Sequence, residues 1–318
     1  MKIALATTGG DAPGMNAAIR SVVRLATEMG HQVYGIRRGY CGLIERDWCA
    51  MGPRDVSGIV NQGGTILRTL RCPYVETEEG LSKACEALSN FDALIVIGGD
   101  GSIRGGWALH ERCGIKVVAV PASIDNDIAG TDTTIGFDTA VNTAVEAIDK
   151  IRDTATSHER VFVVEVMGRA RGFLAVSVAL AAGAEMVLIP EHPFTLSEIE
   201  SSLDEGEKKG KSSSIIVMAE GAGYAPSLVE RLARDRNYSV RLSVLGYMQR
   251  GGNPTATSRL LGALFGEEAL RAAEDDREQA WLVASVDGKL VHRPLVDALK
   301  PKDGPDMRMF DLVSRLAV

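Results

Sequence analysis

The chain has 318 residues, of which 45% are hydrophobic, 24% charged and 5% aromatic, and its formal net charge is −7. This length accommodates about two domains with buried cores. The acidic charge and the few aromatic residues argue against a basic face for a phosphate backbone or a platform for stacked bases, so we expect no nucleic-acid partner. The most apolar stretch, Phe173 to Pro190, carries Glu185 and falls short of the ~20 apolar residues of a membrane span. We therefore expect no membrane segment.

The five cysteines are scattered and lack the Cys-x-x-Cys spacing of metal sites; they lie at positions 41, 49, 72, 85 and 113. No signal-peptide pattern follows Met1. Both observations favour reduced thiols and a cytoplasmic protein.

One unit recurs along the chain: a short apolar run, a polar or glycine-rich loop, and a helical stretch. The apolar runs are residues 2–7, 93–97, 115–120, 161–166, 214–219 and 241–245. This alternation predicts βαβ units with mostly parallel sheets. Ligands of such sheets bind beyond the carboxyl ends of the strands, which is where these loops fall.

The first two loops are rich in glycine. Gly9-Gly10-Asp11 precedes a helix expected from about Met15 and can offer backbone N–H groups to an oxyanion, although an ordinary tight turn explains it equally well. Gly98-Gly-Asp-Gly-Ser102 leaves room for a nucleotide phosphate. Its Asp100 can reach Mg²⁺ and its serine can cap the next helix; a capped turn without a ligand is the alternative.

The third loop, Ser123-Ile-Asp125-Asn-Asp127, is the most specific. Asp125 and Asp127 are two residues apart, so in an extended segment they point the same way. One can then accept a proton from an alcohol while the other assists a metal ion. Asx turns and a helix cap are the structural alternative. Together the three loops predict a phosphoryl-transfer site.

Two helices are expected in the second half. Residues 139–154 carry apolar side chains at helical spacing and are predicted to join two α/β lobes. Residues 197–211 predict a surface helix, with Ser197 and Glu200 as a capping box and Gly210 at its carboxyl end.

Four arginines lie at starts or ends of apolar runs in this half: Arg160, Arg169, Arg241 and Arg250. A guanidinium matches phosphate geometry, so as a set they suggest a pocket for a phosphorylated sugar, although each alone is more often a solvated surface residue. Glu220 could accept hydrogen bonds from sugar hydroxyls, or be a partly exposed loop carboxylate.

The chain resembles the bacterial 6-phosphofructokinases over essentially its whole length. The resemblance rests on Gly9-Gly-Asp-Ala-Pro-Gly-Met-Asn-Ala-Ala-Ile-Arg20, Gly98-Gly-Asp-Gly-Ser102, Ile124-Asp-Asn-Asp127, Thr156-Ser-His-Glu-Arg160, Met167-Gly-Arg169 and Gln249-Arg-Gly-Gly252. It implies transfer of the γ-phosphate of Mg-ATP to the 1-hydroxyl of fructose 6-phosphate, giving fructose 1,6-bisphosphate and ADP, the committed step of glycolysis. It also implies two Rossmann-like lobes with the active site in the cleft between them: residues 1–136 with about 249–300 for the nucleotide, and residues 137–248 with about 301–318 for the sugar phosphate.

The resemblance assigns a role to each motif residue. Asp125 is the general base and Asp127 its carboxylate partner near the metal, while the moving phosphoryl group is contacted by Ser123, Gly10 and Arg71. The Mg²⁺ ligand is Asp100, and the nucleotide is lined by Gly10, Tyr40, Arg71, Cys72, Gly101 and Ser102. The sugar phosphate is contacted by Ser123, Asp125, Met167, Gly168, Arg169, Glu220, Tyr247 and Arg250. Arg160 and Arg241 come from a neighbouring subunit, which implies an oligomer, usually a homotetramer.

Donor and effector are also implied. Pyrophosphate-dependent members of the family carry Asp at the position of Gly101 and Lys at that of Ala122, so ATP is favoured here. An allosteric site for a nucleotide or a phosphoenolpyruvate-type effector is implied by Arg20, Arg24, Arg152, Glu185, Lys209 and Lys211. Tyr247 stands where the family usually has His, and Ser123 where it usually has Thr. Two alternatives stay open: a pyrophosphate-dependent or relaxed-specificity sugar-phosphate kinase of the same fold, and a nucleotide-sensing subunit that does not catalyse.

Overall fold

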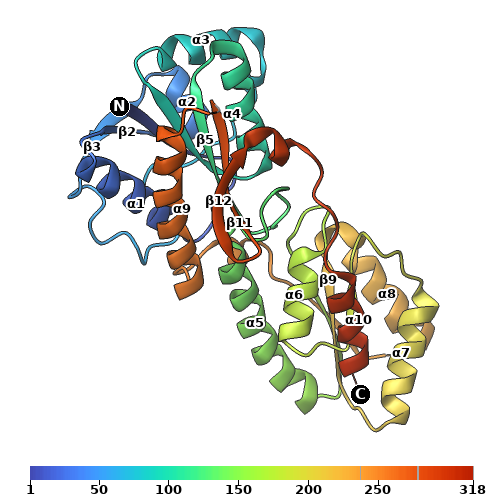
Figure 1. Ribbon diagram of the computed structural model, residues 1–318. Coiled ribbons are helices and arrows are strands. Elements are labelled where there is room, and N and C mark those ends of the chain that lie inside the picture. The colour runs from blue at the N-terminus through green and yellow to red at the C-terminus, as the bar shows by residue number, and fades with distance from the viewer. Residues whose placement is uncertain (237, 278, 318) are drawn as a thin grey trace. The chain divides into compact units, whose positions relative to one another are not determined.

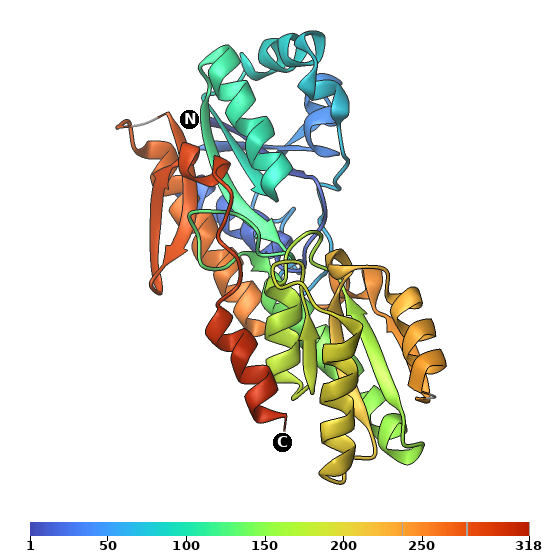
Figure 2. The ribbon, with the colours of Figure 1, turned by 90° about the vertical axis from the view of Figure 1, so that its right-hand side faces the viewer.

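The computed structural model describes residues 1–236, 238–277 and 279–317; Asn237, Glu278 and Val318 lie outside the described residues. The chain divides into two compact units, Met1–Thr139 with Arg250–Lys302 (unit 1) and Ala140–Gln249 with Asp303–Val318 (unit 2). Each unit has its own sheet of mostly parallel strands with helices on it (Figures 1 and 2). The predicted α/β class with mostly parallel sheets is confirmed. None of the helices in the described ranges has the length and apolarity of a membrane span.

The sheet of unit 1 has the strand order β12-β11-β5-β4-β1-β2-β3, with β6 paired to β5. The strands are β1 (Lys2–Thr8), β2 (Gln32–Ile36), β3 (Trp48–Met51), β4 (Ala93–Gly98), β5 (Lys116–Ser123), β6 (Ile135–Gly136), β11 (Ala280–Val286) and β12 (Lys289–Pro294). The edge strands β3 and β12 are antiparallel to their neighbours, and the inner strands are parallel. Every residue of β4 is buried, as expected for a parallel strand covered on both faces.

Helices cover both faces of this sheet (Figure 1). On one face, α2 (Gly39–Ile44), α3 (Glu78–Leu88) and α4 (Asp100–Cys113) bury an apolar cluster that includes Tyr40 and Val96. The helices α1 (Met15–Glu28) and α9 (Ala256–Glu274) pack side by side on the other face.

Small residues let α1 and α9 approach closely. A Cβ at Gly266 would lie 2.6 Å from the Cβ of Ser21 and 3.0 Å from the carbonyl oxygen of Ala18. The hydroxyl of Ser21 donates to the carbonyl oxygen of Ala263 at 2.6 Å. The glycine is therefore required by contact between the helices, because nothing larger fits at this crossing.

The sheet of unit 2 is parallel throughout, in the order β10-β7-β9-β8. Its strands are β7 (Val161–Val166), β8 (Met186–Leu188), β9 (Ser214–Ala219) and β10 (Val240–Val244). One face is covered by α7 (Leu196–Lys208) and α8 (Ala225–Arg236), whose leucines join an apolar cluster with the strands. On the other side of β9 lie α6 (Phe173–Ala181) and α10 (Met307–Leu316), which pack together (Figure 1).

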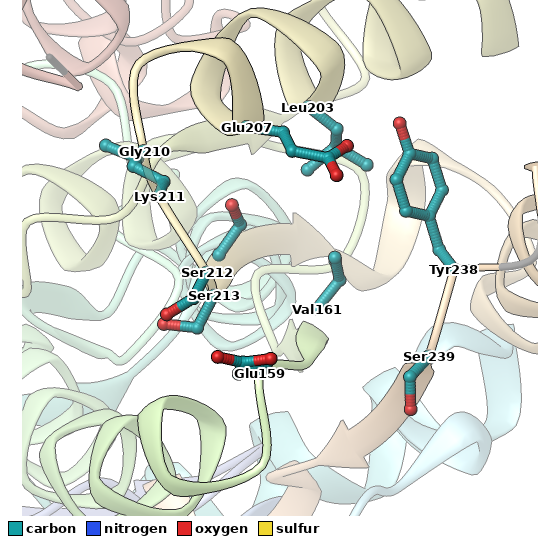
Figure 3. A pocket seen from close by; sticks show the side chains of 11 residues that line it. Glu159, Val161, Leu203, Glu207, Gly210, Lys211, Ser212, Ser213, Tyr238 and Ser239 are labelled. Carbon is teal, nitrogen blue, oxygen red and sulfur yellow. The ribbon is translucent and has the colours of Figure 1, made fainter.

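A hollow of about 350 Å³ opens beside the amino ends of β7, β9 and β10. Its polar lining includes Glu159, Glu207, Lys211 and Tyr238, with serines at 212–214. Figure 3 shows Glu207 and Glu159 on opposite sides of it. The hollow lies at the end of the sheet opposite to Met167 and Glu220.

Both helices expected from sequence are present, with different limits. The connecting helix α5 runs from Phe137 to Ser157. The surface helix begins at Leu196, and its capping box pairs Thr195 with Glu198. The expected box of Ser197 and Glu200 is wrong. Thr195 and Glu198 have the same spacing of three residues, and the helix uses this earlier pair. Gly210 has a φ of +88° just after the C-cap of this helix, as predicted.

The expectation of reduced thiols is wrong for four cysteines in this structure. Cys41 is bonded to Cys72, and Cys85 to Cys113, with a Cα–Cα distance of 5.5 Å in each pair. Cys49 is a free thiol. The partners are 31 and 28 residues apart in sequence, so their spacing gave no sign of pairing.

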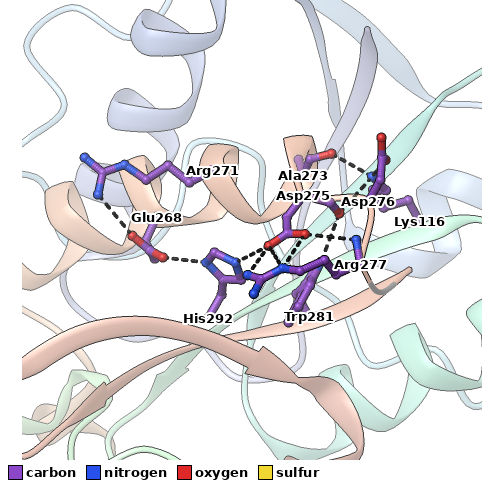
Figure 4. A network of polar contacts seen from close by, with 9 residues as sticks. All are labelled: Lys116, Glu268, Arg271, Ala273, Asp275, Asp276, Arg277, Trp281 and His292. Atoms are coloured by element: carbon purple, nitrogen blue, oxygen red, sulfur yellow. Dashed lines mark hydrogen bonds and ion pairs between the residues drawn. The ribbon is translucent and has the colours of Figure 1, made fainter.

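A polar network ties the end of α9 to the sheet (Figure 4). The ring of His292 bridges the carboxylates of Glu268, at 2.6 Å, and Asp275, at 2.9 Å. The ammonium of Lys116 donates to the carbonyl oxygen of Ala273 at 3.1 Å. The hydrogen bonds of Arg277 and then His292 hold the pKa of Asp275 well below its usual range. This network has a structural role, consistent with the absence of His292 from the predicted site.

Replacing Gly266 with Ala should destabilise the protein. The added methyl would overlap Ser21, and overpacking of this kind lowers the free energy of unfolding by about 1–3 kcal/mol. Urea denaturation measures the change. The matched control is Gly206→Ala in α7, where a Cβ would lie 3.6 Å from the side chain of Lys211. That change should stabilise by about 0.5–1 kcal/mol. Equal effects of the two substitutions would contradict the packing account.

Candidate functional site

The register of three parallel strands brings the three predicted loops together. Thr8 of β1 pairs with Gly98 of β4, which in turn pairs with Pro121 of β5. The hydroxyl of Ser102 donates to the carbonyl oxygen of Thr8 at 2.8 Å and so joins the first two loops. A Cβ at Gly99 would lie 3.8 Å from the carbonyl oxygen of Ala122, beside the third. The loops therefore form one continuous edge of unit 1.

The glycines of the first loop allow other side chains to pack directly against the backbone of that loop. Gly9 has a φ of +84°, and a Cβ on it would lie 2.8 Å from the hydroxyl oxygen of Ser102. A Cβ on Gly10 would lie 2.7 Å from an Nη1 atom of Arg250. A guanidinium is thus packed directly against the backbone of Gly10, which places positive charge where a phosphoryl group is expected.

The third loop is a turn, so the expectation of two carboxylates aligned along an extended segment is wrong. Asn126 has a φ of +52°, and its side-chain amide donates to the carbonyl oxygen of Asp132 at 3.1 Å. Ser123 sits at the centre: its Oγ accepts from the N–H of Asp125 at 3.1 Å and lies 3.4 Å from the Oδ1 of Asp127. The turn still gathers a hydroxyl and two carboxylates, and Asp125 is 3% exposed.

Lys302 contacts this loop from a distant part of the chain, and nothing in the sequence indicated this contact. Its ammonium donates to the carbonyl oxygen of Asn126 at 2.8 Å, across a separation of 176 residues. Burial lowers the pKa of Lys302 to about 8, and the charges of Asp127 and Asp132 oppose that shift. The lysine fixes the turn between the two carboxylates from a segment that only the fold brings near.

Asp100 begins α4, where a carboxylate in the first turn is favoured by the helix dipole. Both of its oxygens accept from the Nε of Arg104 at 3.0 Å. The described residues contain no group of three or more side chains that could hold a metal ion. A single carboxylate still suits Mg²⁺, because this ion is usually held by one or two carboxylates with substrate phosphates and water. Asp100 fits that donor set, and in this structure its carboxylate is paired with Arg104.

The other predicted nucleotide residues take different positions. Tyr40 is 3% exposed and donates to the carbonyl oxygen of Ser102, so it supports the second loop from inside the core. Burial raises its pKa. Arg71 is exposed, Cys72 is in a disulfide, and Gly101 has open space where a side chain would extend. Their contacts with a nucleotide stay predictions.

In unit 2, Met167, Arg169 and Glu220, three of the residues predicted to contact the sugar phosphate, lie at the carboxyl ends of β7 and β9. The N–H of Met167 donates to the Oε1 of Gln249 at 2.8 Å, and that of Arg169 donates to the Oε1 of Glu220 at 2.6 Å. Gly168 has a φ of +130°, a conformation that favours glycine. Gln249, buried completely, was read from sequence only as part of a motif. Its amide holds the Met167 loop in place.

Tyr247 is 81% exposed, on the short helix Gly246–Arg250.

Arg160 and Arg241 lie near the opposite end of this sheet. Arg160 directly precedes β7, whereas Met167 directly follows it. A strand rises by roughly 3.3 Å per residue, so the backbones of these residues are about 20 Å apart. Arg241 pairs with Phe162, at the same end as Arg160. The two sets of residues therefore lie at opposite ends of the sheet of unit 2.

Three of the predicted effector residues cluster in unit 2. The carboxylate of Glu185 lies 3.3 Å from the Nζ of Lys211 and 3.7 Å from the Nη1 of Arg152. Lys209 is exposed at the end of α7. Arg20 and Arg24 are one turn apart on α1 of unit 1, and Arg24 donates to the carbonyl oxygen of Pro53 at 3.5 Å.

Comparison with known proteins gives a single family. The family model described as Phosphofructokinase matches residues 2–273. The ATP-dependent 6-phosphofructokinase of Thermotoga neapolitana is 46% identical over 318 residues, covering 99% of each chain. ATP-dependent 6-phosphofructokinase 1 of Thermus thermophilus is 47% identical over 321 residues, covering 100% of this chain and 99% of that protein.

Solved structures agree. Phosphofructokinase from Saccharomyces cerevisiae superposes on 94% of this chain with a TM-score of 0.89 at 33% identity, and this chain spans 45% of the yeast chain. Pyrophosphate-dependent phosphofructokinase from Marinobacter aquaeolei shares the fold, with a TM-score of 0.84 at 22% identity over 100% of this chain and 92% of that one. The chain belongs to the phosphofructokinase family.

Lys302 should give stability a distinctive dependence on alkaline pH. Its pKa is about 8 in the folded chain, against the ordinary value of about 10.5. Between these values the unfolded chain binds the proton that the folded chain has released, so the free energy of unfolding rises with pH. Below about pH 8 both states are protonated and the full penalty of burying the charge is present.

The test compares urea denaturation of the wild type with Lys302→Met and Lys302→Arg. From about pH 7.5 to 10.5, wild-type stability should rise relative to each variant by about 1–3 kcal/mol. Arg keeps a positive charge over this pH range, and Met has none. Loss of the hydrogen bond to Asn126 would therefore change the free energy of unfolding by the same amount at every pH. Only the titration of Lys302 makes the difference between wild type and variant change with pH. A difference that does not change with pH would contradict the assignment.

Proposed function

We propose that this chain is an ATP-dependent 6-phosphofructokinase, transferring the γ-phosphate of Mg-ATP to the 1-hydroxyl of fructose 6-phosphate. The observation that carries the proposal is the convergence of the Gly9, Gly98 and Ser123 loops at one sheet edge. This edge combines room for phosphates with an alcohol-activating carboxylate, which are the two requirements of phosphoryl transfer to a sugar. We also propose a cytoplasmic location, since that is where glycolytic substrates are used.

Within this proposal, Asp125 accepts the proton of the attacking hydroxyl. Its burial excludes water, and its N–H bond to Ser123 fixes the start of the turn. The backbone N–H of Gly10 and the guanidinium of Arg250 stabilise charge on the transferring group. Asp100 would hold Mg²⁺, and the ion would supply charge that offsets the phosphates when the nucleotide is bound. Most of the acceleration then comes from positioning and electrostatics.

ATP is proposed as donor because the second loop has space for it. Beyond its chain neighbours and the backbone of its own helix, a Cβ on Gly101 would meet no atom within 4 Å, so the space at this position is open. A carboxylate at this position would add negative charge next to the donor phosphates. Ala122, buried at the end of β5, likewise brings no cation that would compete for a second phosphate site.

The sugar-phosphate site is proposed to be completed by a second copy of the chain. Met167, Arg169 and Glu220 bind the sugar from the same chain, together with Gly168 and Tyr247. The distance between the two ends of β7 leaves Arg160 and Arg241 for the 6-phosphate of a neighbouring copy. Guanidinium groups at an interface suit that role because they bind phosphate in a fixed fork. A homotetramer satisfies this need through symmetric interfaces.

We further propose that an anionic effector, a nucleotide or a phosphoenolpyruvate-type compound, binds at Arg152 and Lys211. Glu185 holds both cations in place in the absence of a ligand. We also propose effector contacts for Lys209 and, on α1 of unit 1, for Arg20 and Arg24. An anion would compete with Glu185, or share it through a metal ion.

Asp125→Asn should abolish turnover while leaving substrate binding largely intact. Loss of a general base lowers kcat by about 10²–10⁴-fold. A coupled assay with fructose 6-phosphate and Mg²⁺ measures it, with ATP and pyrophosphate compared as donors. The matched control is Asp132→Asn, seven residues further along the chain, whose carboxylate accepts from the N–H of Asp287 at 2.7 Å and should tolerate an amide. Turnover with pyrophosphate would contradict the donor assignment, and an unaffected Asp125→Asn enzyme would contradict the base.

Mixed assemblies test the shared site. Arg160→Ala and Asp125→Asn chains should each be poorly active at fructose 6-phosphate concentrations below saturation. If each site takes Asp125 from one chain and Arg160 from its neighbour, random mixing in equal amounts restores intact sites in about a quarter of cases. The two variants are unfolded together and refolded, and activity is compared with the separately refolded variants. No recovery in assemblies shown to contain both chains would contradict a shared site.

A further inference from the structure

The disulfide between Cys41 and Cys72 joins two segments that support the proposed donor site. Cys41 lies on α2, and Cys72 ends the segment 65–72, with 5.5 Å between their Cα atoms. Both side chains are half-buried. A small molecule can reach such a pair from solvent, whereas a fully buried pair would be protected.

The segment that ends at Cys72 is bonded to the first glycine loop. The hydroxyl of Thr69 donates to the carbonyl oxygen of Gly9 at 2.8 Å. One residue earlier, the carbonyl oxygen of Arg68 accepts from the hydroxyl of Thr7 at 2.9 Å. Arg71 therefore lies between a residue anchored to the loop and a residue anchored by the disulfide.

The other end of the bridge reaches the second loop. Tyr40 precedes Cys41 and donates to the carbonyl oxygen of Ser102, which itself bonds to Thr8. Breaking the disulfide would release the segment of Arg71 from this buried support. Its side chain is exposed, so its position depends on its neighbours in the chain.

The second disulfide differs in its sequence neighbours. Cys85 and Cys113 join α3 to the end of α4; like Cys72 they pack against the apolar cluster of that face, and like Cys41 and Cys72 they are half-buried. Neither is next in sequence to a residue of the proposed site. This pair is the matched control, because it has the same chemistry in the same unit without a link to the donor loops.

We propose that Cys41 and Cys72 form a reversible thiol–disulfide site whose reaction partner is a low-molecular-weight disulfide, and that their bond tightens donor binding by fixing Arg71. The inference rests on the proposed function for its link to ATP. In oxidation, one protein thiolate attacks the small disulfide, forms a mixed disulfide and expels one small thiolate. The second protein thiolate attacks the protein sulfur of that bond and expels the other. Two protein thiols are oxidised, one small disulfide is reduced, and the two protons end on the two small thiols.

The test equilibrates the full-length protein with oxidised or reduced glutathione and measures Mg-ATP binding by calorimetry and KM for ATP by coupled assay. Intact mass after alkylation of free thiols reports the state of each cysteine. We expect reduction to weaken ATP binding by about three- to tenfold, since a preordered segment is lost, with little change in kcat. The shift should persist in Cys85→Ser and vanish in Cys41→Ser.

Several results would overturn the proposal: thiols 41 and 72 that stay reduced with oxidised glutathione, ATP binding that is equal in both states, or a shift that survives Cys41→Ser. Calorimetry needs no turnover. If the protein binds ATP but has no kinase activity, the proposed function is refuted. The effect of the disulfide on ATP binding can still be measured in that case. If Cys41→Ser fails to fold, the comparison of the oxidised and reduced wild type, with Cys85→Ser as control, decides the matter.

Discussion

The structure of unit 1 depends on the parallel register of β1, β4 and β5. Parallel strands end at the same edge, so residues 90 or more positions apart, such as Thr8 and Gly98, become neighbours. Each strand then continues into a loop with glycine or a small hydroxyl residue rather than into bulky side chains. A shift of one residue in this register would move Ser102 away from Thr8 and separate the loops. The chemistry proposed for the chain follows from that single alignment.

The second constraint is the close packing of neighbouring groups against the backbone, which explains where the chain needs residues with small side chains. Gly10 lies under the guanidinium of Arg250, and Gly9 lies under the hydroxyl of Ser102. The same principle operates at Gly266, between α1 and α9, where no ligand is involved. Glycine alone thus does not mark a binding site. A glycine indicates close packing against the backbone. The neighbouring carboxylate, hydroxyl or arginine determines whether the position also has a function.

The strands and the loops that follow them could be predicted because each depends on a local pattern. A run such as residues 93–97 is apolar throughout, and glycine follows it directly. Features that depend on tertiary contact could not. Lys302 reaches Asn126 across 176 residues, and the partner of Cys41 lies 31 residues away. For the third loop, Asx turns were only the alternative to an extended segment, and the φ of +52° at Asn126 favours the turn. The Met167 loop was found by its motif, but its support by the buried amide of Gln249 needed the structure.

The central claim is that this edge of unit 1 transfers a phosphoryl group from ATP to a sugar hydroxyl rather than to water. Phosphorus NMR of a reaction containing Mg-ATP, fructose 6-phosphate and the full-length chain tests it most directly, because donor, acceptor and product are seen together. The account predicts that ADP and a second phosphate ester on the sugar, at carbon 1, appear in equal amounts. ADP accompanied only by inorganic phosphate, or ATP that stays intact, would contradict it.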